Sequence, residues 1–132
     1  MMRPAIDRRG RALFVYFVVL LGLSLGISEV AAHSRLVKSE PSARAVLDTP
    51  PKELRLWFNE NVEPAFAKVW IVPAEGEQIP LTSHGDSSDP RLLIVAFPDN
   101  VPAGPVTVGY HILSVDGHVV DDKLSFTINK PA

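Results

Sequence analysis

Short runs of alternating apolar and polar residues make up most of the chain after residue 33. In segments 54–58 and 106–112 the apolar side chains fall on every second residue, which is the period of a strand with one buried face. Pro, Gly, Asn and Asp interrupt the runs, and no stretch sustains a helical period for long. The pattern predicts about seven short strands with turns every 8–12 residues, typical of an all-β sandwich or small barrel.

The expected strands differ in how clearly they are marked. Residues 42–47 form only a loose extended piece, and residues 82–90 are polar enough to predict a loop. The expected strands cover residues 35–39, 42–47, 54–58, 68–72, 78–81, 91–97, 106–112 and 123–128.

The first 32 residues have a different composition from the rest. Four arginines lie within residues 3–11, an apolar run covers residues 12–27, and small residues precede position 33. This order is typical of a cleaved secretory signal peptide. An uncleaved anchor is the alternative, but the apolar run is shorter than the roughly 20 residues that span a bilayer. We therefore expect a signal peptide over 1–32, exported by the general or the twin-arginine route, and one domain over 33–132.

Charge and sulfur content restrict the function of residues 33–132. This part holds 9 of the 13 basic and 13 of the 15 acidic residues, a net charge of −4 with neutral histidines. Nucleic-acid binding is therefore not expected, because no basic surface is available to neutralise phosphates. The chain has no cysteine, and its two methionines are Met1 and Met2, so neither thiolate nor thioether ligands remain after cleavage.

Two histidines and one aspartate suggest a metal site. Asp116 and His118 are two residues apart and point to the same side of a strand, with Gly117 able to bend the chain between them. A simple turn is the alternative, because Asp-Gly is a common turn pair. Cleavage after Ala32 would make His33 the first residue, with its α-amine and ring Nδ1 able to chelate one ion. Three nitrogens and one carboxylate oxygen suit Cu(II).

Several segments resemble the CopC family of bacterial periplasmic copper-binding proteins. They are His33 directly after the expected signal peptide, Ser39-Glu40-Pro41, the stretch LWFNENVEPAF at 56–66, the SVDGH motif at 114–118, and SFTI at 125–128. The resemblance implies a seven-stranded Greek-key β-sandwich, cupredoxin-like or immunoglobulin-like. It also implies a Cu(II) site built from the N-terminal amine, His33, Asp116 and His118. A non-enzymatic, soluble periplasmic copper carrier with an inner-membrane CopD-type partner would follow.

The chain departs from that family in two ways. It lacks the methionine-rich loop with which some members bind Cu(I), which implies a Cu(II)-only type. Asp121 and Asp122 also occupy a region where the family usually has glycine, and we interpret them as a solvated acidic turn.

The remaining candidates have simpler interpretations, and two other functions stay open. We interpret His84 as a solvated loop residue and His111 as a surface residue flanking the site, while Glu60 is a candidate partner that orients a ligating histidine. A histidine-brace copper oxidase also uses an N-terminal histidine, although an aspartate ligand would fill the position that oxygen needs. The third function is a metal-free sandwich that mediates protein contacts.

Overall fold

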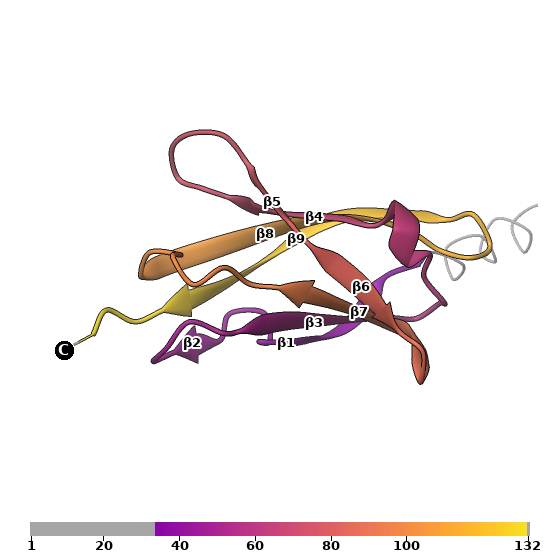
Figure 1. Ribbon diagram of the computed structural model, residues 1–132, viewed down its shortest axis with the longest axis horizontal. Helices are drawn as coiled ribbons and strands as arrows, with labels where there is room; N and C mark the ends of the chain where they lie inside the picture. The colour runs from indigo at the N-terminus through magenta and orange to yellow at the C-terminus, as the bar shows by residue number, and fades with distance from the viewer. Residues whose placement is uncertain (1–33, 132) are drawn as a thin grey trace, which may run out of the picture. The chain divides into compact units, whose positions relative to one another are not determined.

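The computed structural model describes residues 34–131, which form two packed β-sheets (Figure 1). One sheet has four strands in the order β1-β3-β7-β6, and the other has five in the order β2-β9-β8-β4-β5. The strands are β1 (Leu36–Glu40), β2 (Val46–Leu47), β3 (Glu53–Phe58), β4 (Lys68–Val72), β5 (Ile79–Leu81), β6 (Ser83–Asp86), β7 (Asp89–Ala96), β8 (Gly104–Leu113) and β9 (Val119–Ile128), and a 3-10 turn, η2 (Pro64–Phe66), precedes β4. The predicted β-sandwich is confirmed.

The alternating residues supply the core between the two sheets. On β3 the side chains of Leu54, Leu56 and Phe58 are buried, whereas those between them are partly exposed. On the facing sheet β8 and β9 do the same with Val106, Val108, Tyr110, Ile112, Leu124, Phe126 and Ile128. Each large apolar side chain buried in this way contributes about 1.5–3 kcal/mol to folding. The strand period of the sequence is therefore also the packing period of the core.

β8 and β9 form the longest hairpin, paired in antiparallel register from Gly104 opposite Ile128 to Leu113 opposite Val119. Residues 114–118 make the turn at the end of this hairpin. On the outer face of the sheet, Trp70 of β4 lies across Gly109 of β8. A Cβ atom added at Gly109 would come within 2.5 Å of the indole. The small residue is required here because it makes room for the tryptophan.

Within residues 34–131 the structure has nine strands, not about seven. The segment expected to be a polar loop, 82–90, is a hairpin in which β6 pairs with β7, so that prediction was wrong. Its small and polar residues carry no apolar alternation, because β6 is an edge strand. The last strand begins at Val119 and not at 123, and β2 keeps only two residues of the predicted 42–47.

The same edge hairpin also supports η2. Gly85 of β6 lies so close to Pro64 that an added Cβ would come within 2.6 Å of the proline Cγ.

In the part of the chain that the structure describes, no helix is long and apolar enough to cross a membrane.

Candidate metal centre

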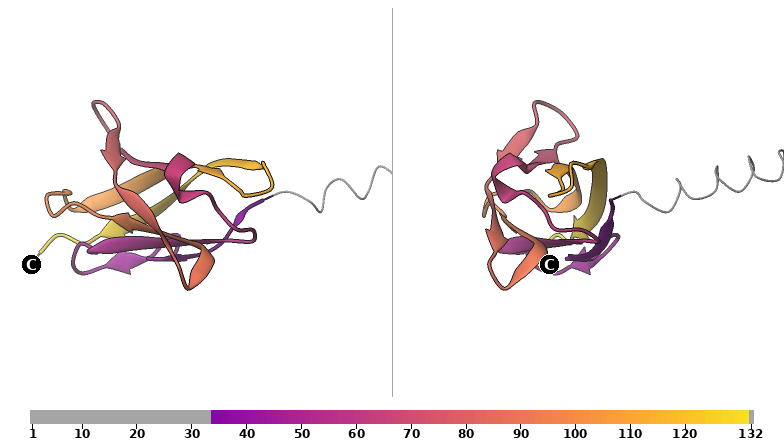
Figure 2. Two further views of the ribbon diagram at one scale, coloured as in Figure 1. Left: turned by 45° about the vertical axis from the view of Figure 1, so that its right-hand side comes forward. Right: turned by 90° about the vertical axis from the view of Figure 1, so that its right-hand side faces the viewer.

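Three segments that are distant in sequence meet at one end of the sandwich: the start of the described chain, the segment after β3, and the β8–β9 turn (Figure 2). The backbone N–H of Asn59 donates to the carbonyl of Arg35 at 3.0 Å, and the N–H of Arg35 donates to the Asn59 side chain at 2.8 Å. On the other side, the N–H of Val115 donates to the carbonyl of Asn61 at 2.9 Å. Residues 59–61 thus join the chain start to the turn.

The β8–β9 turn brings Asp116 and His118 together through its backbone. The N–H of Ser114 donates to the carbonyl of His118 at 2.8 Å, and the N–H of Gly117 donates to the carbonyl of Ser114 at 3.0 Å. Gly117 has a φ of 91°, a conformation that residues with a Cβ rarely adopt. The result places Asp116 Oδ2 3.3 Å from His118 Nδ1. The Asp-Gly turn and the juxtaposition of the two side chains are therefore the same feature.

Ser114 forms hydrogen bonds with both candidate ligand residues. Its side chain is buried, its hydroxyl donates to the carboxylate of Asp116, and the hydroxyl oxygen accepts the backbone N–H of His118 at 3.0 Å. The Ser114 hydroxyl is the main reason why the pKa of Asp116 lies below its ordinary value of 3.8, and the Glu60 carboxyl and the charge of His118 act in the same direction. Asp116 is therefore an ionised carboxylate at neutral pH.

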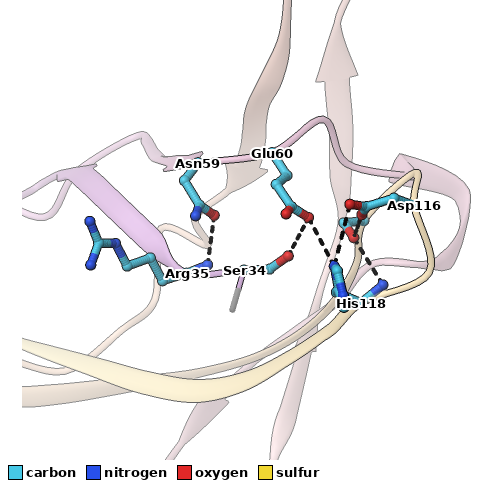
Figure 3. A network of polar contacts seen from close by, with 7 residues as sticks. Ser34, Arg35, Asn59, Glu60, Asp116 and His118 are labelled. Atoms are coloured by element: carbon cyan, nitrogen blue, oxygen red, sulfur yellow. Dashed lines mark hydrogen bonds and ion pairs between the residues drawn. The ribbon is translucent and has the colours of Figure 1, made fainter. Parts of the chain in front are cut away.

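Glu60 completes the cluster and connects it to the chain start (Figure 3). Its Oε2 lies 3.4 Å from His118 Nδ1 and accepts the hydroxyl of Ser34. One ligand atom each from Glu60, Asp116 and His118 lie within 4.8 Å of one another. The side chains of Asp116 and His118 are about half exposed, so an ion could enter and leave directly from solvent. A carboxylate and imidazole cluster of this kind can hold a divalent metal.

The structure brings together two of the three residues predicted as ligands. Asp116 and His118 are adjacent, and the candidate orienting residue Glu60 contacts the imidazole. His33 lies outside the described residues, as does the whole of the expected signal peptide over 1–32. The role of all three as copper ligands stays a prediction.

The other two histidines lie away from this cluster. His111 is on the outer face of β8, where its Nδ1 is 2.7 Å from Asp121 Oδ1 of β9. His84 is exposed on β6 and is not part of the loop we expected. Tyr110, beside His111 in sequence, faces the core, where burial raises its pKa to about 12. None of these side chains contributes to the candidate metal centre.

Sequence reasoning missed two serines that organise the centre. Ser114 stands four residues before His118, and a serine hydroxyl often bonds a nearby backbone N–H, which was the available signal. Nothing in the sequence marks Ser34 as a partner of Glu60, which lies 26 residues further along the chain. Only the folded chain brings that pair together.

The fold and the site define a small β-sandwich protein with an acidic and imidazole cluster at one end. A family model described as the CopC domain matches residues 36–129. The chain therefore belongs to the CopC family. This membership indicates a function in copper resistance or copper transport. It also indicates that the protein is a copper-binding carrier and not an enzyme.

Individual relatives agree with this assignment. Protein YobA of Escherichia coli K12 is 32% identical over 86% of this chain and 92% of its own length. Copper transport protein CutJ of Bacillus subtilis is 26% identical over 87% of this chain, but the match covers only 21% of CutJ. Among solved structures, CopC from Methylosinus trichosporium OB3b has a TM-score of 0.68 and 34% identity, covering 74% of this chain and 94% of that one.

Proposed function

We propose that this protein binds Cu(II) in the periplasm and carries it for copper homeostasis or resistance. The proposed ligands are the α-amine and ring of His33, exposed by cleavage after Ala32, together with Asp116 and His118. Residues 33–132 contain no cysteine or methionine, so the available donors are nitrogen and oxygen. These donors suit Cu(II) better than they suit Cu(I). Several CopC-family relatives are named copper resistance or copper transport proteins.

The observation that carries the proposal is the contact between Ser34 and Glu60. Ser34 follows His33 directly, and consecutive Cα atoms are about 3.8 Å apart. The Ser34 hydroxyl donates to the carboxylate that also contacts His118. A terminal histidine attached to Ser34 would therefore lie about one residue length from this contact, and we propose that it reaches Asp116 and His118.

Glu60 has a supporting role in this proposal. Metal-ligating histidines usually donate their second ring N–H to a carboxylate or carbonyl, which fixes the ring. Glu60 Oε2 lies 3.4 Å from Nδ1 of His118, so its carboxylate can orient the imidazole that we propose as a ligand. Asp116 Oδ2 lies 3.3 Å from the same ring nitrogen, so two carboxylates concentrate negative charge beside the imidazole, which suits retention of a cation.

A membrane-bound copper protein of the CopD type is the proposed partner. The match to CutJ supports it, because a segment similar to nearly all of this chain occurs within a much longer copper transport protein. Neither the comparisons nor the geometry favour the oxidase or the metal-free alternative.

The proposal is tested by combining intact mass with Cu(II) electron paramagnetic resonance of the exported protein. The mass should begin at His33, and the spectrum should show mixed nitrogen and oxygen ligands. Adding one alanine before His33 should lower the Cu(II) affinity by orders of magnitude, because the amine is then displaced from its chelate. His118→Ala should have a similar effect, whereas the matched control His84→Ala should have none. Unchanged affinity in the extended protein would exclude the proposed ligand set.

A further inference from the structure

A groove lies at the opposite end of β8 from the metal centre. It is formed by the loop between β4 and β5 and the loop between β7 and β8, and its volume is about 370 Å³. Both loops lie at the end of the sandwich remote from residues 114–118 (Figure 1). The part of β8 from Val106 to Leu113 separates the groove from the β8–β9 turn by about 24 Å.

The lining of this groove is mostly aliphatic and proline. Val72 and Ile79 form part of it and are 37% and 45% exposed, whereas Val101 packs against the hydrophobic core. Four of the lining residues are prolines, which have no backbone N–H to donate. Apolar side chains would gain most by filling this groove, and its volume lies in the lower part of the range of about 300–1,000 Å³ for binding pockets.

The two loops also carry charge of one sign only. Segments 72–79 and 97–106 contain Glu75, Glu77 and Asp99 but no lysine, arginine or histidine. All three carboxylates are exposed, and within residues 34–131 no ion pair involves them. An apolar groove beside three unpaired carboxylates is complementary to a ligand that combines apolar side chains with positive charge.

We propose that this groove docks a partner polypeptide segment in which apolar side chains are flanked by lysine or arginine. An anionic membrane surface is disfavoured as the occupant, because the three carboxylates would be repelled by its charge. A partner bound here would leave Asp116 and His118 exposed at the other end. The groove would thus hold the protein while its metal centre remains free to exchange an ion. This proposal does not depend on the identity of the metal or of its ligands.

The test uses the purified protein and the synthetic peptide Lys-Lys-Leu-Val-Leu-Val-Lys-Lys, with a matched peptide that has Glu in place of Lys. Fluorescence anisotropy should give at least about tenfold tighter binding of the lysine peptide at low salt, and the difference should shrink in about 0.5 M salt. Amide chemical shifts of ¹⁵N-labelled protein should change in 71–80 and 97–106 and stay constant in 114–118.

Two variants and two matched controls locate the interaction. Ile79→Ser removes an exposed apolar side chain from the groove, and the double variant Glu75→Gln with Glu77→Gln removes two charges, so each should weaken peptide binding at least about fivefold. Val46→Ser replaces an exposed apolar side chain and Glu40→Gln removes one charge elsewhere on the surface, and both should leave binding unchanged. Absence of peptide binding, equal affinity for both peptides, or binding only to phosphatidylserine vesicles would each overturn the proposal.

Discussion

Replacing Ser114 by alanine tests whether one buried hydroxyl holds the metal centre in shape. The hydroxyl accepts the backbone N–H of His118 at 3.0 Å and donates to the carboxylate of Asp116. Alanine fits the same space but makes neither bond. We expect Asp116 and His118 to lose their fixed separation, which in turn should weaken Cu(II) binding by roughly 10- to 100-fold, as for other residues that orient metal ligands.

The cost in stability follows from the same two bonds. The bond with the His118 backbone is counted at a net value of about 1 kcal/mol. The bond with Asp116 contributes less to the stability, because that carboxylate is open to water. The cavity left by the missing hydroxyl adds some cost, because Ser114 is only 3% exposed in the native protein. We expect the free energy of unfolding to fall by about 1–2 kcal/mol, which lowers Tm by roughly 4–8 °C per kcal/mol.

The pH dependence gives a second readout. The folded-state pKa of Asp116 lies below 3.8, so Asp116 stabilises the fold above that pH and loses this contribution as the pH falls through its folded pKa. Since the Ser114 hydroxyl is the main cause, the pKa of Asp116 should rise towards 3.8 in Ser114→Ala. The stability difference from the native protein should then narrow in acid below pH 3.8.

Urea denaturation measures the stability, and side-chain NMR titration measures the pKa of Asp116. Ser125→Ala is the matched control, because Ser125 is exposed and its hydroxyl pairs with that of Thr107 at 3.0 Å. It should change the free energy of unfolding by less than about 0.5 kcal/mol. If Ser114→Ala is as stable as the control and leaves the pKa of Asp116 unchanged, Ser114 does not organise the centre.

Three further predictions concern residues outside the centre. Gly109→Ala should destabilise the fold by about 1–3 kcal/mol and alter tryptophan fluorescence, because its Cβ would displace the Trp70 indole. Leu56→Ala, at a position 0% exposed, should cost about 2–5 kcal/mol in urea denaturation. His111→Ala should leave Cu(II) affinity unchanged in a competition titration, since His111 pairs with Asp121; a loss of affinity would place it in the centre.

Some features of the fold could be predicted because they are local. Alternation on 54–58 and 106–112 revealed which side chains are buried, since a strand turns every second residue to the same face. The edge strand β6 could not be found in this way, because only pairing with β7 defines it and its residues carry no apolar alternation. The same reasoning explains why β2 and the start of β9 were misplaced.

In the candidate centre, too, the local contacts could be predicted from the sequence and the long-range contacts could not. By itself the sequence determined the pairing of Asp116 with His118, because two residues around a glycine turn are neighbours in any fold. It also determined that residues 33–132 contain no sulfur donors. Only the tertiary structure decided that Glu60 and Ser34 join them, since these residues are 58 and 26 positions away from their partners. The contact between Ser34 and Glu60 follows from the pairing of β1 with β3, and the contact between Glu60 and His118 follows from the packing of the two sheets. No local pattern in the sequence records either contact.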